Sequence, residues 1–494
     1  MMKKFNLTLI VAATLLTACT RDFDKFDVRN PIPAEDANSI NFTIPIEEAI
    51  EELNSVLDAI DEQQMAAGGG AMVMAMNNRR QIDKVSVVYS NMPILQKEST
   101  TSPTGMQKAP ATTYKDSLLY VVDFKDNKGC AVLAADRRIP ETVLAITETG
   151  SFNNMDSNMF PPTYKQGMYS DSELMKGFSL YNAEVDDYYV ASDFINPLTF
   201  CKDYANFHIQ LVHKEFNPLP KGSYLERGKW KIIEKIAPML ITIWHQDSPF
   251  NDEAPYLSWF PWQEPKRSPA GCFPIAIAQI IAYHEKISVI NGYILDWKNI
   301  KKNLCVYNKS DNKGVTHENL RGIAYLLQYL SVSCRAIHTP EFTFVLPCNA
   351  RKTMARIYGN ATTHCSYNNG VVYNMLNNNK PVLVCAVSDC VDGHAWVVDG
   401  YLHRKRKMRE VQLGEGGLPS SVVSEYEDEQ TLVHCNWGWT GRCNGYYLQG
   451  IFDLRDGPIE YENSIGENDT TYKKSYNKSY EYFKKFIYTI TYSE

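Results

Sequence analysis

The run SPAGCFPIAIAQIIAYHE, at residues 268–285, constrains the fold of this chain more than any other stretch. Almost every residue after Gly271-Cys272 is apolar, and a helix that is apolar on nearly all sides is a buried helix. Pro274 is compatible with this helix, because a proline in the first turn removes an amide that has no intrahelical partner. Cys272 is therefore expected at a helix N-terminus, where unpaired amides and the helix dipole favour the thiolate. This stretch alone is equally consistent with a buried structural cysteine.

Length, charge and cysteine usage limit the classes of protein that the chain can belong to. Its 494 residues exceed the usual size of one hydrophobic core, so at least two domains are expected. The net charge of −7 argues against nucleic acid or an anionic membrane surface as a partner. The 12 cysteines are scattered singly and do not form the framework of a small disulfide-stabilised protein.

The N-terminus has the pattern of an export signal. Lys3-Lys4 precedes an apolar run, Phe5–Leu16, that is too short to span a bilayer. Residues 16–19, LTAC, resemble the lipobox of bacterial lipoproteins, and the resemblance implies a signal peptide over 1–18 and lipidation of Cys19. A plain secretory signal with an incidental cysteine is the alternative, and either pattern predicts an exported protein. Residues 19–44 are polar and are expected to form a tether.

The first domain is expected over residues 45–230 as a small α+β module. Apolar residues recur at helical spacing from Ile46 to Ile60. Three β-type runs follow, divided by turn residues in the pattern of a meander: Leu118–Phe124, Cys130–Ala134 and Thr142–Thr147. This domain carries no convergent set of catalytic residue types. Residues 218–229 have the prolines, glycines and basic residues of a domain boundary.

The second domain is expected over residues 231–494 and is also of the α+β class. Helical patterns at 318–331 and 350–358 follow the central helix, and apolar strand patterns begin at residue 381. Helices followed by an antiparallel set of strands are typical of α+β folds. The charged, glycine-containing stretch 402–430 is expected to form a long surface loop.

Three candidates in this domain have the residue types that a cysteine nucleophile needs. Such a nucleophile requires a base, a group that orients the base, and donors for an oxyanion. His394 opens a predicted strand, Asn436-Trp437 closes another, and Gln246 lies in a loop before Cys272. Each also has an ordinary structural explanation, so their spacing alone gives only weak grounds for a Cys-His enzyme.

Four motifs give a more specific indication. The chain carries WHQDSPFN, GCFPIAIAQIIAYH, GHAWVVDGY and HCNWGWTGRCNGYY in this order. They resemble the motifs WxQ…PYN, GCVATAxAQIMxYH, GHAFVxDGY and HxNWGWxGxxNGYF of the streptopain family of papain-like cysteine peptidases. The resemblance covers residues 232–452. The segment YVVDFKDNKGCAVLAADRRIPETVLAI and the GSF after it resemble the propeptide of that family.

The resemblance implies a papain-like α+β fold and a role for each matching residue. It implies that Cys272 is the nucleophile, that His394 is the general base and acid, and that the two form a thiolate–imidazolium pair. It implies that Gln246, with the backbone amide of Cys272, forms the oxyanion hole. No metal or organic cofactor is implied.

The other residues that match the family motifs are expected to lie around His394. The resemblance implies that Asn436 and Trp437 lie against His394 and orient its ring, and that Trp439 forms a wall of the site. A direct role for Asp399 is a weaker expectation, because an Asp-Gly pair after a strand is usually a turn.

Phe273-Pro274 and the stretch 402–430, which is longer and more charged than expected, depart from the family pattern. Phe273-Pro274 replaces the small residues that follow the cysteine, and this bulk could alter the oxyanion geometry. His434 and Cys435, with Cys385 and Cys390, suggest a metal site, but their spacing fits no common ligand pattern.

These features predict a secreted, lipid-anchored zymogen of a streptopain-like cysteine endopeptidase. The first domain would act as an intramolecular inhibitor, and the partners would be protein or peptide substrates, with membrane contact through the N-terminal lipid only and no nucleic acid. Two alternatives stay open. One is a catalytically impaired surface lipoprotein that uses the fold as a binding or inhibitory module. The other is a Cys-His amidase that acts on cell-wall peptides.

Overall fold

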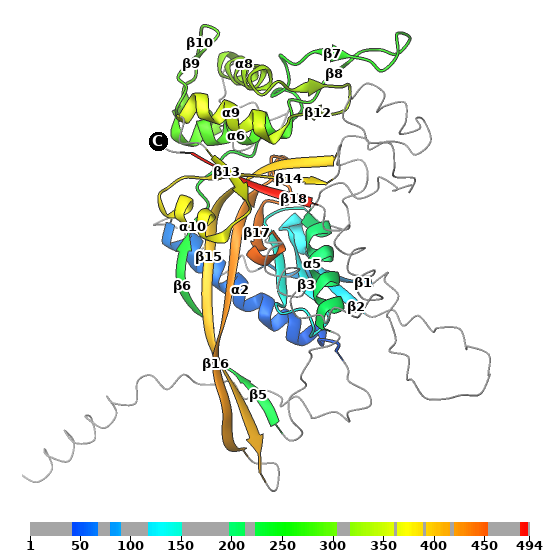
Figure 1. The fold of residues 1–494 in the computed structure, drawn as a ribbon, viewed down its shortest axis with the longest axis vertical. Coiled ribbons are helices and arrows are strands. Elements are labelled where there is room, and N and C mark those ends of the chain that lie inside the picture. Colours follow the sequence, from blue (N-terminus) through cyan, green and yellow to red (C-terminus); the bar gives the residue numbers. More distant parts are fainter. Residues whose placement is uncertain are drawn as a thin grey trace, which may run out of the picture. The chain divides into compact units, whose positions relative to one another are not determined.

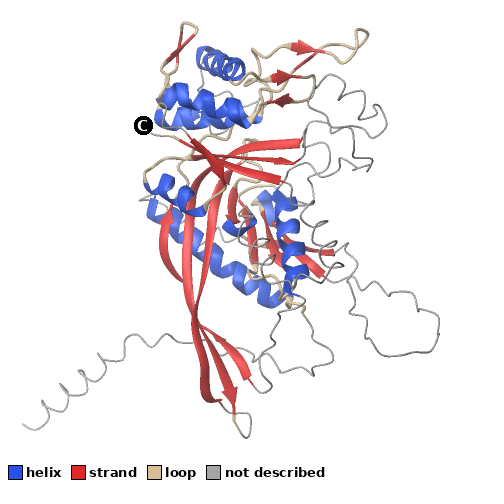
Figure 2. Ribbon diagram, in the orientation of Figure 1, coloured by secondary structure: helices blue, strands red, loops and turns tan. Residues whose placement is uncertain are grey.

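The computed structural model describes most of the chain between residues 42 and 492 (Figures 1 and 2). The described ranges are 42–67, 80–89, 117–150, 197–212, 223–303, 317–359, 363–388, 392–414, 419–452 and 485–492. The predicted signal peptide, Cys19 and nearly all of the tether lie outside them. Within these ranges, no helix is both long and apolar enough to cross a membrane.

Two compact units make up the chain. One contains the described residues of Asn217–Glu234 and His403–Gln430, and the other contains those of Phe42–Phe216, Lys235–Leu402 and Thr431–Glu494. We call the part of the larger unit up to residue 212 the N-terminal region and the part from residue 235 the C-terminal region. The predicted boundary near residue 230 stays a prediction.

The N-terminal region is the predicted α+β module. Its elements are α2 (Ile46–Ala67), β1 (Ile82–Tyr89), β2 (Ser117–Phe124), η1 (Lys125–Asn127), β3 (Cys130–Ala134), β4 (Val143–Thr147) and α5 (Pro197–Val212). Strands β1 to β4 pair antiparallel in sequence order, so the predicted meander is confirmed. Every residue of β3 is buried, because α2 and α5 both pack against this sheet (Figure 1).

The C-terminal region combines a helical half with an antiparallel half. Its helices are α6 (Cys272–His284), α7 (Trp297–Asn303), α8 (His317–Ser333), α9 (Pro347–Tyr358) and α10 (Asn369–Asn377). Its main strands are β13 (Thr363–Ser366), β14 (Val382–Ser388), β15 (Asp392–Leu413), β16 (Pro419–Asn436), β17 (Gly445–Leu448) and β18 (Lys485–Thr491), with η3 (Gln449–Ile451) after β17. Short strands complete it: β6 (Lys231–Ile236), β7 (Tyr256–Leu257), β8 (Lys266–Arg267), β9 (Val289–Ile290), β10 (Tyr293–Ile294), β11 (Ile337–His338) and β12 (Thr343–Phe344). The predicted α+β class is confirmed.

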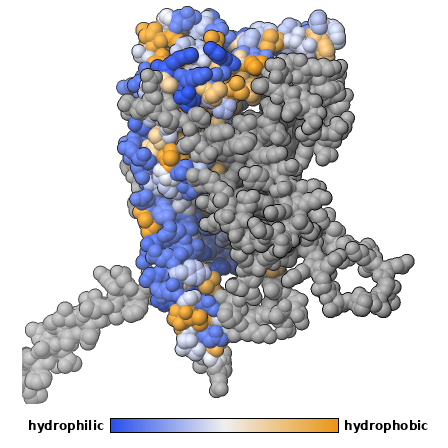
Figure 3. All heavy atoms as spheres, viewed as in Figure 1, coloured by the Kyte–Doolittle hydropathy of each residue, from blue (hydrophilic) through white to orange (hydrophobic). Residues whose placement is uncertain are grey.

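Helix α6 is the buried helix that the sequence predicts. Its residues from Phe273 to Ala282 are all buried, and it packs against α8 and β14. Helices α6, α8 and α9 lie together in Figures 1 and 2. On the face drawn in Figure 3, hydrophobic side chains are mixed with hydrophilic ones at this end of the molecule.

One continuous sheet joins the N-terminal region to the C-terminal region. Its order is β1-β2-β3-β4-β17-β16-β15-β14-β18-β13, and β4 pairs antiparallel with β17. Gly445 is required at this junction, because a Cβ atom there would lie within 2.2 Å of the Ile146 carbonyl oxygen. The last strand of the N-terminal meander is therefore seated directly on a strand of the C-terminal region.

The smaller unit corrects one expectation. The predicted surface loop over 402–430 is wrong, because β15 and β16 extend through most of it, and β5 (Ser223–Arg227), within the predicted boundary segment, pairs with Met408–Gln412 of β15. Opposite charges face each other across these strands and stabilise them. The pairs are Lys405–Glu427 at 3.0 Å, Arg406–Asp428 at 2.8 Å and Arg409–Glu425 at 2.7 Å. Charged and polar residues dominate both arms and hide the strand pattern, although Arg404, Met408 and Val411 of β15 are buried.

Candidate active site

Cys272 is the first residue of α6, as the sequence predicts. Gly271 before it has a φ of 96°, a conformation that favours glycine, and Thr343 leaves little room for a side chain there. The amide of Ile275 donates to the Gly271 carbonyl at 3.1 Å and starts the helix. Backbone amides of Ala395, Phe273 and Cys272 itself act as hydrogen-bond donors toward the sulfur and lower the pKa of the thiol. Ala395 directly follows His394, so the strand of the histidine meets the start of the cysteine helix.

His394 is held on β15 by the backbone of the NWGW segment. Its Nε2 atom lies 2.9 Å from the carbonyl oxygen of Trp437, and the ring is buried. A carbonyl can only accept, so Nε2 carries the proton in this bond. Nδ1 is therefore the atom of the neutral ring that can take up a further proton.

Aromatic rings enclose the imidazole. The rings of His394 and Trp439 stack with centroids 4.4 Å apart, and Trp437 stacks on the other two rings at 5.9 Å from His394 and 5.5 Å from Trp439. Trp396 and Trp437 stack in turn at 4.7 Å. The ring and the carbonyl of Trp437 thus both contact the histidine, and Trp439 forms a wall against it.

The surroundings of Cys272 and His394 favour the neutral form of each side chain. Burial raises the pKa of the Cys272 thiol to about 11 and outweighs the three backbone donors. Burial likewise lowers the pKa of the His394 imidazole to about 4, although the bond to Trp437 raises it. The two side chains make no hydrogen bond with each other within the described part of the chain. Both shifts therefore favour the neutral forms over the expected thiolate–imidazolium pair, although Cys272 as a whole residue is only partly buried.

Gln246 lies beside the segment that leads to Cys272. Its backbone carbonyl accepts from the amide of Ala270 at 2.8 Å. Its side chain is half-buried and makes no hydrogen bond to the residues that the structure describes. The side-chain amide is thus available as a donor close to the start of α6.

A buried polar triangle explains where the side chain of Asn436 lies. Thr242 Oγ1 donates to Gln279 Oε1 at 3.0 Å, and Gln279 Nε2 donates to Asn436 Oδ1 at 3.3 Å. Asn436 Nδ2 donates in turn to the Thr242 carbonyl at 2.7 Å. Of the two residues expected to orient His394, Trp437 therefore contacts the ring, whereas Asn436 ties β16 to α6.

Sequence reasoning assigned no role to Gln279, although a signal was present. Gln279 is the single polar residue between Ile275 and Ala282, and it is completely buried. A polar side chain in an otherwise apolar, buried helix must find hydrogen-bond partners inside the protein. Here those partners belong to the segments that carry Gln246 and Trp437.

Asp399 pairs with His434 on the neighbouring strand. His434 Nδ1 and Asp399 Oδ1 are 2.6 Å apart, and Asp399 Oδ2 accepts from the amide of Leu240 at 2.8 Å. Both carboxylate oxygens are thus bound within the C-terminal region. Among the described residues, no group of three or more His, Cys, Asp or Glu is arranged to hold a metal ion, and Cys390 lies outside those residues.

Phe273 and Pro274 keep the start of the helix intact. Both side chains are buried, and the ring of Phe273 is only 4% exposed. Pro274 is the third residue of α6, where its missing amide breaks no intrahelical bond. Pro274 therefore does not remove a donor near the sulfur, because the donors that α6 supplies are the amides of Cys272 and Phe273.

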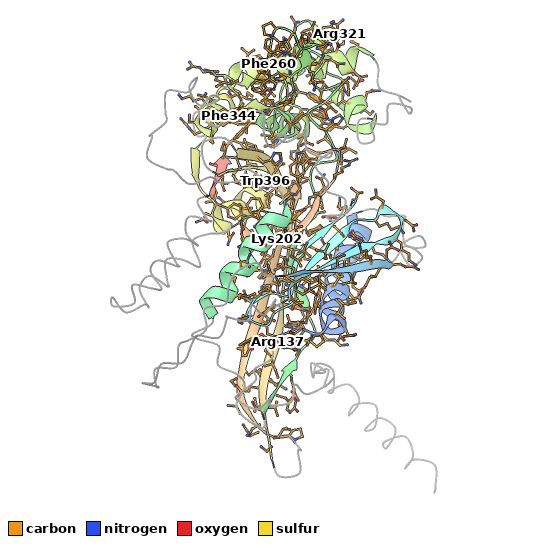
Figure 4. The ribbon with its side chains drawn as sticks, turned by 90° about the vertical axis from the view of Figure 1, so that its right-hand side faces the viewer. Arg137, Lys202, Phe260, Arg321, Phe344 and Trp396 are labelled. Atoms are coloured by element: carbon orange, nitrogen blue, oxygen red, sulfur yellow. The ribbon has the colours of Figure 1, made fainter. Side chains whose placement is uncertain are left out.

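The N-terminal region reaches the aromatic cluster behind the histidine. Phe200 of α5 lies with its ring centroid 5.9 Å from that of Trp396 and 6.3 Å from that of Trp437. Figure 4 labels Trp396 on β15 and Lys202 on α5, the strand and the helix that the contact of Phe200 with Trp396 joins. A helix of the N-terminal region thus packs one aromatic ring away from His394.

Comparisons with known proteins agree with the motifs. Residues 244–447 match the model of the Peptidase C10 family, the streptopain family, so the predicted resemblance is confirmed over this segment. No curated protein matches the chain. The C-terminal region is thus similar to the streptopain family over residues 244–447, and an α+β region precedes it.

Two solved structures are similar to the chain. One is a fragment of prointerpain A from Prevotella intermedia, with 18% identity, a TM-score of 0.42, and coverage of 76% of this chain and 96% of that one. The other is the active wild-type interpain A cysteine protease from Prevotella intermedia. Its identity is 21%, its TM-score is 0.31, and the match covers 43% of this chain and 85% of that one.

Proposed function

We propose that the protein is the zymogen of a cysteine endopeptidase in which Cys272 and His394 hydrolyse peptide bonds. The observation that carries this proposal is that the backbone of Ala395, the residue after His394, lies close enough to the Cys272 sulfur to lower the pKa of its thiol. It brings a cysteine at a helix N-terminus next to the strand position of a histidine whose Nε2 is already bound. Nucleophile, base and orienting group are the parts that covalent catalysis by cysteine requires.

Acylation follows from the atoms at this site. The Cys272 thiol gives its proton to Nδ1 of His394, and the sulfur attacks the carbonyl carbon of the scissile bond. As the C–S bond forms, the carbonyl electron pair moves to oxygen. We assign the stabilisation of this oxyanion to the Cys272 amide and the Gln246 side chain, at about 3 kcal/mol per donor.

Breakdown of the intermediate releases the two products. The oxyanion reforms the carbonyl, the C–N bond breaks, and His394 gives its proton to the leaving amine. A water molecule then gives a proton to Nδ1 and attacks the thioester, and collapse of the second oxyanion frees the acid and the Cys272 sulfur. Trp437 keeps the ring in one orientation throughout, and no step calls for a metal or a cofactor.

The neutral state of the two groups supports the zymogen part of the proposal. Their pKa values of about 11 and about 4 both come from burial, so access of water to the site would move the two values toward each other. The N-terminal region packs through Phe200 on the cluster that contacts His394. We infer that release of this region lets the ion pair form.

The leader sequence supports a second part of the proposal. LTAC at residues 16–19 fits export and attachment of lipid to Cys19 in the bacterial cell envelope. Metabolic labelling with radioactive palmitate tests this part. Label in the wild-type chain and none in Cys19→Ala is the expected result, and equal label in both would contradict it.

Self-processing tests the proposed activity. Purified wild type, Cys272→Ala and the control Cys348→Ala are incubated, followed by N-terminal sequencing and a casein assay. Cys348 is an exposed cysteine outside the site, so its loss should change nothing. New N-termini and casein cleavage in wild type and Cys348→Ala, but not in Cys272→Ala, are expected.

Three other outcomes would contradict the proposal. Intact casein, with processed wild type that fails to react with iodoacetamide at Cys272, would favour a binding or inhibitory module. Release of cell-wall peptides without cleavage of protein would favour an amidase. Casein cleavage by Cys272→Ala at the wild-type rate would assign the activity to another residue.

A further inference from the structure

A chain of three charged residues links the N-terminal region to the strands next to the site. Glu148 directly follows β4, His434 lies near the end of β16, and Asp399 lies on β15. His434 Nδ1 is 2.6 Å from Asp399 Oδ1, and its Nε2 is 3.4 Å from Glu148 Oε1. Two of these residues come from the C-terminal region, and only Glu148 comes from the N-terminal region.

The carboxylate of Glu148 stabilises the charged ring of His434 more than it would stabilise that of a surface histidine, because His434 is buried. The side chain of His434 is 4% exposed, that of Asp399 is completely buried, and that of Glu148 is 36% exposed. Burial lowers the pKa of His434, but Asp399 and, to a smaller extent, Glu148 together raise it to about 10, which favours the imidazolium. Within the described chain, the buried Nε2 of His434 makes no hydrogen bond of regular geometry. The anion that it faces is the carboxylate of Glu148, at 3.4 Å. A buried N–H of a cation is costly to leave without an acceptor.

The pairing of β4 with β17 places Glu148 at this position. Ile146 is paired with Tyr446, which on its other side is paired with His434. The amide of Glu148 then donates to the Asn444 carbonyl at 2.7 Å, and Thr149 Oγ1 donates to the Gly441 carbonyl at 3.0 Å. The strand register therefore places the carboxylate of Glu148 beside Nε2 of His434.

The other groups around Glu148 keep it ionised. Arg80 donates to the Thr147 carbonyl at 2.8 Å, and its charge, together with that of His434, lowers the pKa of Glu148 against the effect of burial. The ring of Tyr446 lies edge-on to His434 at 5.1 Å. Carboxylate and imidazolium are thus both charged near neutral pH.

We propose that Glu148 is the recognition residue of the N-terminal region and that His434–Asp399, beside β17, forms its receptor site. The partner that fits this site is an extended strand with a carboxylate just past its paired segment. In the full chain the N-terminal region is that partner. The inference rests on the proposed zymogen and names the contact by which the inhibitory region holds the enzyme.

Self-processing of the full chain tests the proposal. Glu148→Gln removes the charge and keeps the shape, Glu148→Asp keeps the charge at a longer distance, and Glu141→Gln removes a carboxylate that is not a partner of His434. Glu148→Gln should process at least about fivefold faster than wild type, because a buried donor loses its anion. Glu148→Asp should be intermediate and Glu141→Gln unchanged. Processed enzyme from all variants should cleave casein equally, because both glutamates precede the predicted boundary.

The self-processing experiment separates a failure of the proposed function from a failure of the proposed recognition site. A wild-type chain that neither processes nor cleaves casein would overturn the proposed function. A wild-type chain that does both, with Glu148→Gln processing at the rate of Glu141→Gln, would overturn the recognition site alone.

A second measurement needs no catalytic activity. In the Cys272→Ala chain, urea unfolding is followed for Glu148→Gln, His434→Asn and the double variant. The double variant should unfold at nearly the same urea concentration as His434→Asn, because both changes remove one interaction. Fully additive shifts in the midpoint would overturn the proposal whether or not the enzyme is active.

Discussion

His394 donates the proton of Nε2 to the carbonyl oxygen of Trp437 across 2.9 Å. The acceptor is a backbone atom, so it persists whatever side chain stands at position 437. The bond fixes the tautomer of the imidazole and leaves Nδ1 as its basic atom. The aromatic side chains then decide how firmly the ring is held in that orientation.

Removal of the ring that stacks most closely on His394 should reduce turnover more than binding. Trp439→Ala deletes the contact at 4.4 Å and leaves the Trp437 carbonyl in place. We expect kcat of the processed enzyme to fall by about tenfold or more, with a smaller change in KM, because the base is less well positioned. Trp262→Ala, at a position 78% exposed, is the control. A change confined to KM would assign Trp439 to substrate binding instead.

The reactivity of Cys272 should depend on processing and on pH. In the full chain the pKa of the thiol is about 11, so about one molecule in ten thousand is a thiolate at pH 7. Alkylation of Cys272 by iodoacetamide should therefore be slow at pH 7 and should accelerate up to about pH 11. After processing it should be fast at neutral pH. Peptide mass mapping separates Cys272 from the exposed Cys348, and equal rates before and after processing would contradict the zymogen.

Gln246→Ala should lower kcat of the processed enzyme by about a hundredfold, since removal of one oxyanion donor has an effect of that size. KM should change little, because the donor acts mainly on the oxyanion. Gln263→Ala removes an exposed glutamine from the same connecting segment and serves as the control. An unchanged kcat in Gln246→Ala would leave the Cys272 amide as the only oxyanion donor of the proposed mechanism.

Gln279→Leu should destabilise the chain, because it removes the acceptor of the buried Thr242 hydroxyl and one of the donors to Asn436 Oδ1. The expected loss is about 1–3 kcal/mol in the free energy of unfolding, measured with urea in the Cys272→Ala chain. Gln328→Leu, on the exposed face of α8, is the matched control. Equal midpoints for the two variants would show that the triangle adds nothing to stability.

The His434–Asp399 pair should make stability fall on the alkaline side. The pKa of His434 is raised from 6.5 to about 10, so protonated His434 favours the folded state. Its contribution is complete below pH 6.5, declines as pH rises, and is lost above about pH 10. His434→Asn should unfold more easily than the parent Cys272→Ala chain at pH 6 and should show a flatter decline toward pH 10. Parallel curves for the two chains would contradict the raised pKa.

The sequence was sufficient to predict the elements that have a strong apolar period. Helix α6, the meander β2 to β4 and the strands that carry His394 and Asn436 all lie where their patterns place them. Residues 275–282 are apolar except for Gln279, and a helix with so little polar surface is a buried helix. The residues proposed for catalysis came from motifs, because no periodicity could show that Gln246 and His394 converge on Cys272.

Other features could not be read in advance, for physical reasons. The charged arms of β15 and β16 are stabilised by ion pairs between strands, and such pairs leave no trace in the hydropathy pattern. The neutral state of Cys272 depends on burial by segments far away in the sequence. The pairing of Glu148 with His434 depends on strand register, which is set only when β4 meets β17.

The junction at Gly445 has a consequence for the enzyme after processing. In the full chain β17 is an interior strand, with β4 on one side and β16 on the other. Loss of the N-terminal region turns it into an edge whose amides and carbonyls face solvent, and such an edge can pair with another chain. Gly445 has no side chain that could block the approach of another strand to this edge. Removal of the N-terminal region would therefore expose a surface that is prone to self-association.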